Sequence, residues 1–197
     1  MKFTITAASA TALATALLLS GCSATPSGGH PGMSRSGSSA SATANTAGSH
    51  NDADVRFAQN MVMHHQQAIQ MADMLLGKAG VDERVTALAQ KVKAAQQPEI
   101  GTMNGWLTGW RASTGMPAHD MGGMMSDSDM AALKNASGAD AGKLFLTQMV
   151  QHHQGAIEMA QQEITNGKNA DAVALAKKIA TDQTAEIATM QNLAATL

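Results

Sequence analysis

Two tandem histidine pairs carry most of the chemistry that this sequence offers. The pairs are His64 with His65 and His152 with His153. They account for four of the seven histidines, and each lies within the same motif, Met-x-x-His-His-x-x-Ala-Ile-x-Met-Ala, at residues 61–72 and 149–160. Imidazole is a ligand that suits zinc, copper, iron and nickel. The repeated motif therefore marks these histidines as candidate metal ligands.

A sequence repeat extends beyond the histidines. Phe57 and Phe145 occupy matching places upstream of the two motifs. The matching segments downstream are residues 87–92 with 174–179 and 96–103 with 183–190. A repeat of this length, with apolar residues at helical spacing, predicts two similar helical hairpins that pack together. Each hairpin would then bring one histidine pair into the interior.

Apolar spacing and capping residues predict four long helices and a short one, so the fold class is all-α. The first long helix is expected from a cap at Asp52 or Asp54 to Lys78, and the second from near Asp82. The short helix is expected from the Ser126–Asp129 cap to about Lys134. The third long helix is expected over about 140–166 and the fourth from near Asp171. Pro98 lacks a backbone N–H, so we expect the second helix to bend between Ala94 and Pro98. The second copy has Ala185 at the matching position and should be straight.

Two glutamates interrupt the apolar stripes of the second and fourth long helices. They are Glu99 and Glu186, and a charged Glu is seldom fully buried unless a partner or a metal ion compensates it. We therefore expect Glu99 to meet the first histidine pair and Glu186 to meet the second. Adjacent residues of a helix point about 100° apart, so both histidines of one pair are not expected to bind the same ion.

The candidate core site combines these groups with flanking methionines. Its expected ligands are His64, His65, His152, His153, Glu99 and Glu186, with Met61, Met149, Met103 and Met190 as thioether ligands. Thioethers select Cu(I), and imidazole suits copper as well. The alternative is a structural hydrogen-bond network in a polar core, around which the methionines only pack.

A second methionine-rich stretch, residues 116–125, lies between the two repeats. Its candidate ligands are Met116, His119, Met121, Met124 and Met125. Pro and Gly residues in this stretch argue against a helix seam, and its thioethers favour Cu(I). We expect a looser Cu(I) site there, and the alternative is a disordered methionine-rich loop.

The N-terminal residues predict export and a lipid anchor. A charged start followed by an uncharged run is typical of a secretory signal peptide, here residues 1–21. The sequence Leu19-Ser20-Gly21-Cys22 resembles the bacterial lipobox, so Cys22 is the expected lipidated residue that holds the protein at the membrane. Residues 22–51, rich in Gly, Ser and Ala, are expected to be a flexible tether, and 52–197 the folded domain. We therefore expect an extracytoplasmic, lipid-anchored protein.

The twin motif, with the trailing Glu-Ile-x-x-Met segments at 99–103 and 186–190, resembles the bacterial family called domain of unknown function 305. The resemblance covers about residues 52–195. It implies a ferritin-like four-helix bundle that is secreted or membrane-anchored, with copper binding in some members. A di-iron enzyme of that fold would carry a Glu three residues before each of two histidines. No Glu precedes any histidine of the two pairs in this way, so copper is favoured over zinc or iron.

The favoured functional hypothesis is a membrane-anchored extracytoplasmic protein that binds copper and sequesters it or transfers it to a partner protein, without catalysis. A metal-dependent oxidoreductase of the same fold and a metal-free structural or partner-binding bundle are the alternatives. A net charge of −2, without a cluster of Lys or Arg, argues against a nucleic-acid partner. The sequence leaves open the oxidation state of the metal, the number of sites and the oligomeric state.

Overall fold

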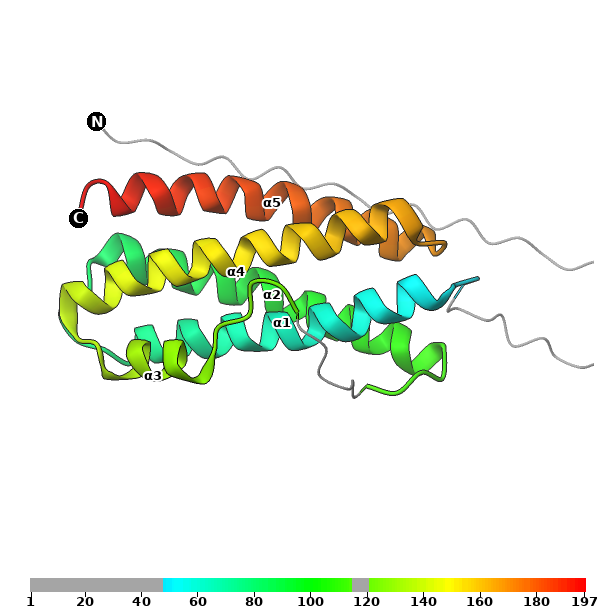
Figure 1. Ribbon diagram of the computed structural model, residues 1–197, viewed down its shortest axis with the longest axis horizontal. Coiled ribbons are helices and arrows are strands. Elements are labelled where there is room, and N and C mark those ends of the chain that lie inside the picture. The colour runs from blue at the N-terminus through cyan, green and yellow to red at the C-terminus, as the bar shows by residue number, and fades with distance from the viewer. Residues whose placement is uncertain (1–47, 115–120) are drawn as a thin grey trace, which may run out of the picture. The chain divides into compact units, whose positions relative to one another are not determined.

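A computed structural model describes residues 48–114 and 121–197, which form helices and no strand (Figure 1). The helices are α1 (Asp52–Leu76), α2 (Glu83–Gly109), α3 (Asp127–Asn135), α4 (Gly138–Asn166) and α5 (Ala170–Ala194). The predicted all-α class is confirmed. The predicted signal peptide, Cys22 and most of the tether lie outside the described residues, as do Met116 and His119 of the methionine-rich stretch.

Side-chain caps set the starts of the helices. The N-cap of α1 is Asn51, which accepts hydrogen bonds from the backbone N–H groups of Ala53 and Asp54, so the expected cap at Asp52 or Asp54 was wrong by one to three positions. Asp54 instead completes a capping box, because its carboxylate accepts from the Asn51 N–H. The expected cap of α3 is confirmed, since Ser126 forms a capping box with Asp129.

Pro98 lies inside α2, which is continuous from Glu83 to Gly109. The missing N–H therefore does not end the helix. The bend expected between Ala94 and Pro98 stays a prediction.

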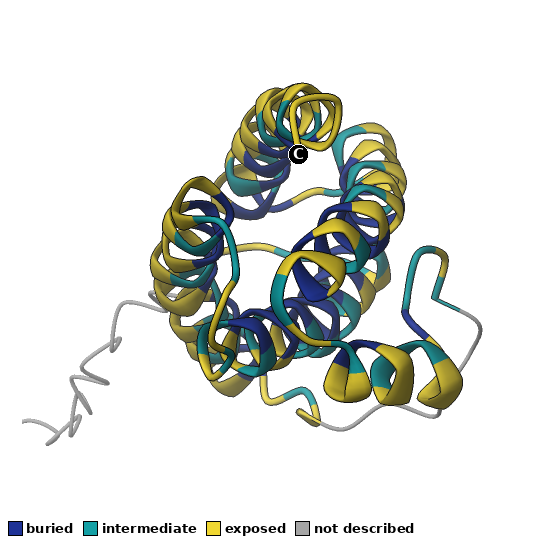
Figure 2. Ribbon diagram, turned by 90° about the vertical axis from the view of Figure 1, so that its left-hand side faces the viewer, coloured by how far each residue is buried: buried dark blue, intermediate teal, exposed yellow. Residues whose placement is uncertain are grey.

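The predicted pairing into two hairpins is confirmed. Helix α1 packs along α2, α4 packs along α5, and the two hairpins meet mainly through α1 and α4. The short helix α3 lies in the segment that connects the two hairpins, and it contacts α1 and α4. Figure 2 views the bundle from one end and shows the buried residues turned toward its middle, with exposed residues on the outside.

Two apolar clusters form the core, one toward each end of the bundle. One cluster contains Met71, Leu75, Phe145, Met149 and Met190 among others, and the other contains Phe57, Met61, Met103, Leu107 and Ile179. Each fully buried side chain of this size stabilises the fold by about 1.5–3 kcal/mol. On each long helix, one or two buried His or Gln residues fall between the two clusters in the sequence. We call this band of His64, His65, Gln96, His152, His153 and Gln183 the polar layer.

No helix within residues 48–114 and 121–197 is both long and apolar enough to cross a membrane.

Candidate metal site

One histidine of each motif meets the other at the α1–α4 contact. The side chains of all four histidines are fully buried. One ring of each pair faces the other hairpin, because the centroids of the His64 and His152 rings are 3.7 Å apart and their planes are tilted by 39°. The helical angle of about 100° between neighbours then directs the other ring of each pair elsewhere.

The remaining ring of each pair contacts a glutamate of its own hairpin. His65 Nε2 lies 2.9 Å from Glu99 Oε2, and His153 Nε2 lies 2.7 Å from Glu186 Oε2. Both contacts were expected from the sequence and are confirmed. A carboxylate at one ring nitrogen fixes the orientation of the imidazole and raises the basicity of the other nitrogen.

Lys178 also reaches this region, and the sequence analysis missed it. Its Nζ lies 3.0 Å from Glu99 Oε1 and 2.7 Å from Asp182 Oδ2. The first contact joins α5 to α2 across the two hairpins. The sequence repeat does not predict the Lys178–Glu99 ion pair. Lys91, the counterpart of Lys178, forms no ion pair within the part of the chain that the structure describes.

Burial keeps the imidazoles of His64, His65 and His152 neutral. It lowers the pKa of His64 to about 3, with His65 and His153 adding to the effect and the Gly122 backbone opposing it. The pKa of His152 lies well below its usual value, first through burial and then through His64. Burial also lowers the pKa of His65, although Glu99 acts in the opposite direction. Neutral imidazole is the form that binds metal ions.

Several buried polar atoms of this layer have no hydrogen bond of acceptable geometry among the described residues. They are both ring nitrogens of His64 and of His152, Nδ1 of His65 and of His153, both amide atoms of Gln96, and Oε1 of Gln183. A buried polar group left unpaired costs about 1–3 kcal/mol. So many unpaired polar atoms in one layer therefore need a compensating partner, such as water or a bound ion.

The four candidate methionines of the core lie on both sides of the polar layer. Met61 and Met103 belong to one apolar cluster, and Met149 and Met190 belong to the other. All four are fully buried. Residues three apart on a helix are neighbours, which places Met61 next to His64 and Met149 next to His152. Packing accounts for these methionines, and their role as ligands stays a prediction.

The described end of the methionine-rich stretch, residues 121–125, lies across α1 and α4 (Figure 1). The backbone N–H of Met125 donates to Gln67 Oε1 at 2.7 Å, and Gln67 Nε2 donates to the Met125 carbonyl at 2.9 Å. Met125 itself is buried in the core, whereas Met121 and Met124 are partly exposed. The three methionines therefore do not share one environment, and the expected loop site stays a prediction.

Backbone packing brings the same segment close to the polar layer. A methyl group at Gly155, which follows His152 by one helical turn, would overlap the Gly122 carbonyl. Gly123 also packs on this turn of α4 and has a positive φ of 82°. Glycine is therefore needed on both sides of the contact.

Within the described residues, no three His, Cys, Asp or Glu side chains converge to form a metal site by themselves. A metal ion at the polar layer would thus need thioether or amide donors as well, or a shift of the side chains. The chemistry of the available donors, neutral imidazole and thioether, suits copper.

Comparison with known proteins places the chain in a family. Residues 54–194 match the family described as Domain of unknown function (DUF305). A DUF305 protein from Streptomyces coelicolor, thought to be secreted, is 31% identical over 72% of this chain and 89% of that chain, with a TM-score of 0.69. A DUF305 fragment from Deinococcus radiodurans is 29% identical over 75% of this chain and 98% of that chain, also with a TM-score of 0.69.

A third similar structure is CopM in the Cu(I)-bound form. It is 32% identical over 71% of this chain and 94% of that chain, with a TM-score of 0.61. CopM structures in Cu(II)-bound, silver-bound and apo forms are similar to the chain as well. No curated protein matches the chain. From the family match and these structures it follows that the chain belongs to the DUF305 family of helical proteins.

Proposed function

We propose that this protein binds copper in the polar layer of its bundle and sequesters or transfers it outside the cytoplasm. The observation that carries the proposal is the pair His64 and His152, whose buried rings face each other at 3.7 Å and whose ring nitrogens have no hydrogen bond of acceptable geometry among the described residues. The similarity to CopM, which has been solved in Cu(I)-bound and Cu(II)-bound forms, supports copper as the metal.

His65 and His153, the histidine of each pair that contacts a glutamate, fit a supporting role at such a site. Glu99 and Glu186 hold Nε2 of His65 and His153, which leaves Nδ1 of each ring without a partner. A histidine held in this way presents its free nitrogen as a ligand. With His64 and His152, the layer offers neutral nitrogen donors from two different hairpins. Thioethers of Met61 and Met149 would favour Cu(I).

The proposed location rests on the N-terminal sequence. The lipobox-like Cys22 would anchor the protein on the outer side of the cytoplasmic membrane, and residues 22–51 would let the domain reach a copper-transfer partner. Catalysis is not part of the proposal. Mass spectrometry of the protein isolated from membranes tests the anchor, since Cys22→Ser should abolish both acylation and membrane association.

A Cu(I) competition titration of the full chain under anaerobic conditions tests the metal site. His64→Leu combined with His152→Leu removes the nitrogen donors and keeps apolar volume, so we expect Cu(I) affinity to fall at least about tenfold. Met74→Leu changes a methionine that packs against the core outside the polar layer and is the matched control. Met121→Leu with Met124→Leu separately tests the loop.

The same samples distinguish the alternatives. A ligand that binds only the folded state raises the melting temperature, so copper should stabilise the wild type and the Met74→Leu control but not the double His variant. Wild-type binding no tighter than that of the double His variant would overturn the proposal. A metal-free polar core would then be the better account of the paired histidines.

A further inference from the structure

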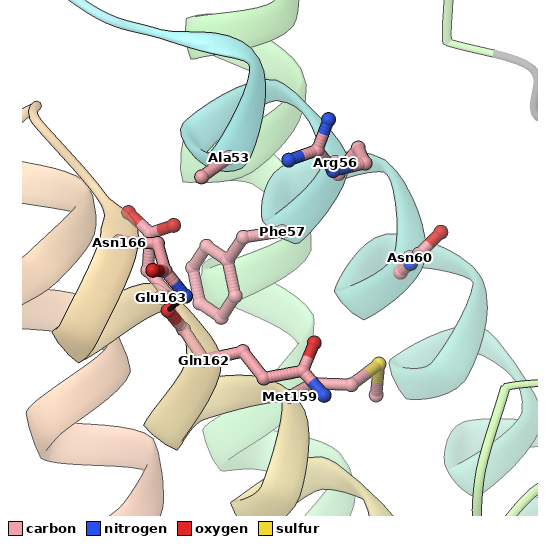
Figure 3. A pocket seen from close by; sticks show the side chains of 8 residues that line it. All are labelled: Ala53, Arg56, Phe57, Asn60, Met159, Gln162, Glu163 and Asn166. Carbon is pink, nitrogen blue, oxygen red and sulfur yellow. Dashed lines mark hydrogen bonds between the residues drawn. The ribbon is translucent and has the colours of Figure 1, made fainter.

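A cavity lies between the start of α1 and the end of α4, away from the polar layer (Figure 3). Its volume is about 110 Å³. It is lined by Ala53, Arg56, Phe57, Asn60, Met159, Gln162, Glu163 and Asn166. Glu163 follows His153 by ten residues, or roughly 15 Å along the helix at 1.5 Å per residue. The cavity is therefore separate from the candidate metal site.

Glu163 is the unusual member of this lining. Its side chain is 1% exposed, and neither carboxyl oxygen has a hydrogen-bond donor among the described residues. Beside it lies the buried Asp54, whose carboxylate is well supplied with donors. The backbone N–H groups that donate to Asp54 are those of Asn51 at 2.6 Å, Lys168 at 3.0 Å and Asn169 at 2.8 Å.

These surroundings shift the pKa values of the two carboxyl groups in opposite directions. Burial, together with the neighbouring Asp54, raises the pKa of Glu163 to about 8. Burial acts to raise the pKa of Asp54 too, but the backbone N–H groups around it hold that pKa below its usual value. Near neutral pH, Asp54 is therefore ionised and Glu163 holds a proton. The pair carries one negative charge, and its member Glu163 lines the cavity.

The outer end of the cavity carries the opposite charge. Arg56 is exposed and forms no ion pair within residues 48–114 and 121–197. Figure 3 shows the Phe57 ring between Arg56 on α1 and Glu163 on α4. The other polar lining residues, Asn60, Gln162 and Asn166, are uncharged amides. A cationic group, an apolar wall and an acidic group thus follow one another through the cavity.

We propose that this cavity binds a small zwitterion, with its ammonium group at Glu163 and its carboxylate at Arg56. The ammonium supplies the donor that the Glu163 oxygens lack, and an arginine side chain is suited to bind a carboxylate with two hydrogen bonds. Phe57 and Met159 would contact the apolar part of the ligand. An apolar cavity of roughly 150 Å³ accommodates benzene, so a molecule of about six non-hydrogen atoms, such as L-alanine, is of suitable size.

Proton release is a signature of this binding mode. The ammonium keeps its own proton, and Glu163 loses its proton to the solvent as the ion pair forms. Because the ionised form of Glu163 binds the ligand, affinity should rise by up to about tenfold per pH unit below the Glu163 pKa of about 8 and level off above it. A ligand without an ammonium group would show no such increase.

Calorimetric titration of the full chain with L-alanine between about pH 6 and pH 8 tests the proposal. Propionate lacks the ammonium and ethylamine lacks the carboxylate, so each should bind at least about tenfold more weakly than L-alanine. Arg56→Gln alters an exposed side chain and should weaken binding without affecting folding. Glu163→Gln should remove both binding and its pH dependence. Arg84→Gln, which changes an exposed arginine at the start of α2, is the control.

Two results would overturn the proposal. One is no measurable heat with L-alanine at any of these pH values, in which case water supplies the missing donor to Glu163. The other is L-alanine binding that stays unchanged in Arg56→Gln and Glu163→Gln. Thermal unfolding of each variant confirms that it is folded. Neither substitution touches the polar layer, so the outcome is independent of copper binding.

Discussion

In the first hairpin, formed by α1 and α2, Glu99 contacts both His65 and Lys178, whereas in the second hairpin Glu186 contacts His153 and no Lys within the described residues. The side chain of Glu99 is 11% exposed and that of Glu186 is 23% exposed. The repeated sequence thus builds the contact inside each hairpin twice. The contact between hairpins is made once, because it depends on how α2 and α5 approach each other.

The segment that joins the hairpins adds a second difference. On α4 the Gly122 backbone of this segment packs against Gly155, and the matching position on α1 is Gln67. The Gln67 side chain forms two hydrogen bonds with the Met125 backbone, whereas its counterpart Gly155 has no side chain and is approached by the backbone of the segment. Two similar hairpins have therefore acquired different neighbours around one shared polar layer.

Acid should act on both hairpins alike, and this is the largest expected effect. The pKa of His64 falls from 6.5 to about 3 on folding, and that of His152 also falls well below 6.5. The unfolded chain therefore binds more protons below pH 6.5, and stability decreases as the pH falls from there toward 3. For His64 alone, the loss over this interval is on the order of 5 kcal/mol.

Urea unfolding at a series of pH values measures this loss. His64→Leu and His152→Leu should each flatten the acid dependence by a similar amount. If only one of them did so, the two hairpins would differ in the polar layer itself. Glu99 acts at lower pH, because its lowered pKa adds stability above 4.5 that is lost as pH falls through the folded value.

Gly155→Ala should break the packing of the joining segment on α4. The added methyl overlaps the Gly122 carbonyl, and overpacking costs about 1–3 kcal/mol. Alanine gains up to about 1 kcal/mol in a helix interior, so a net loss of about 1–2 kcal/mol is expected. Urea unfolding gives the loss, and faster hydrogen exchange of the Met125 amide reports the undocked segment.

Ala68→Gly, at a fully buried position of α1, is the control for that substitution. It should cost about 1 kcal/mol through helix propensity and backbone freedom and leave Met125 exchange nearly unchanged. Equal protection of Met125 in wild type and Gly155→Ala would show that the close approach of Gly122 does not hold the segment in place.

Lys178→Met should have the smallest effect. Lys178 is 56% exposed, and exposed ion pairs contribute about 0–1 kcal/mol. We expect a loss near the upper end of that range, because Glu99 is mostly buried, and a smaller loss in high salt. Lys91→Met should change stability by less than about 0.5 kcal/mol. Equal values for the two variants would contradict the asymmetry between the hairpins.

Much of the helical bundle could be predicted from local patterns. Apolar spacing placed the helices, and the repeat predicted the hairpins, because both depend on residues a few positions apart. The cap of α1 was misplaced, since several polar residues adjoin at its start and only the backbone geometry shows that Asn51 is the cap. The capping box of Ser126 with Asp129 was simpler to predict because both residues lie in one short segment.

Less of the candidate site could be predicted. The meeting of Glu99 with His65 and of Glu186 with His153 follows from seam positions inside one hairpin. The sequence could not show that Met125 is buried while Met121 and Met124 are partly exposed, since the packing of the segment on α1 and α4 decides this. Metal binding by any of these residues stays a prediction.

The sequence by itself determined which side chains face inward, because helical periodicity places His64 and His65 on two adjoining apolar stripes and repeats this in α4. Only the tertiary structure decided which ring of each pair meets the other hairpin, since that depends on the rotation of α1 against α4. It also brought Asp54 and Glu163 together. No local pattern predicts a contact between residues this far apart, because long-range packing alone places them side by side.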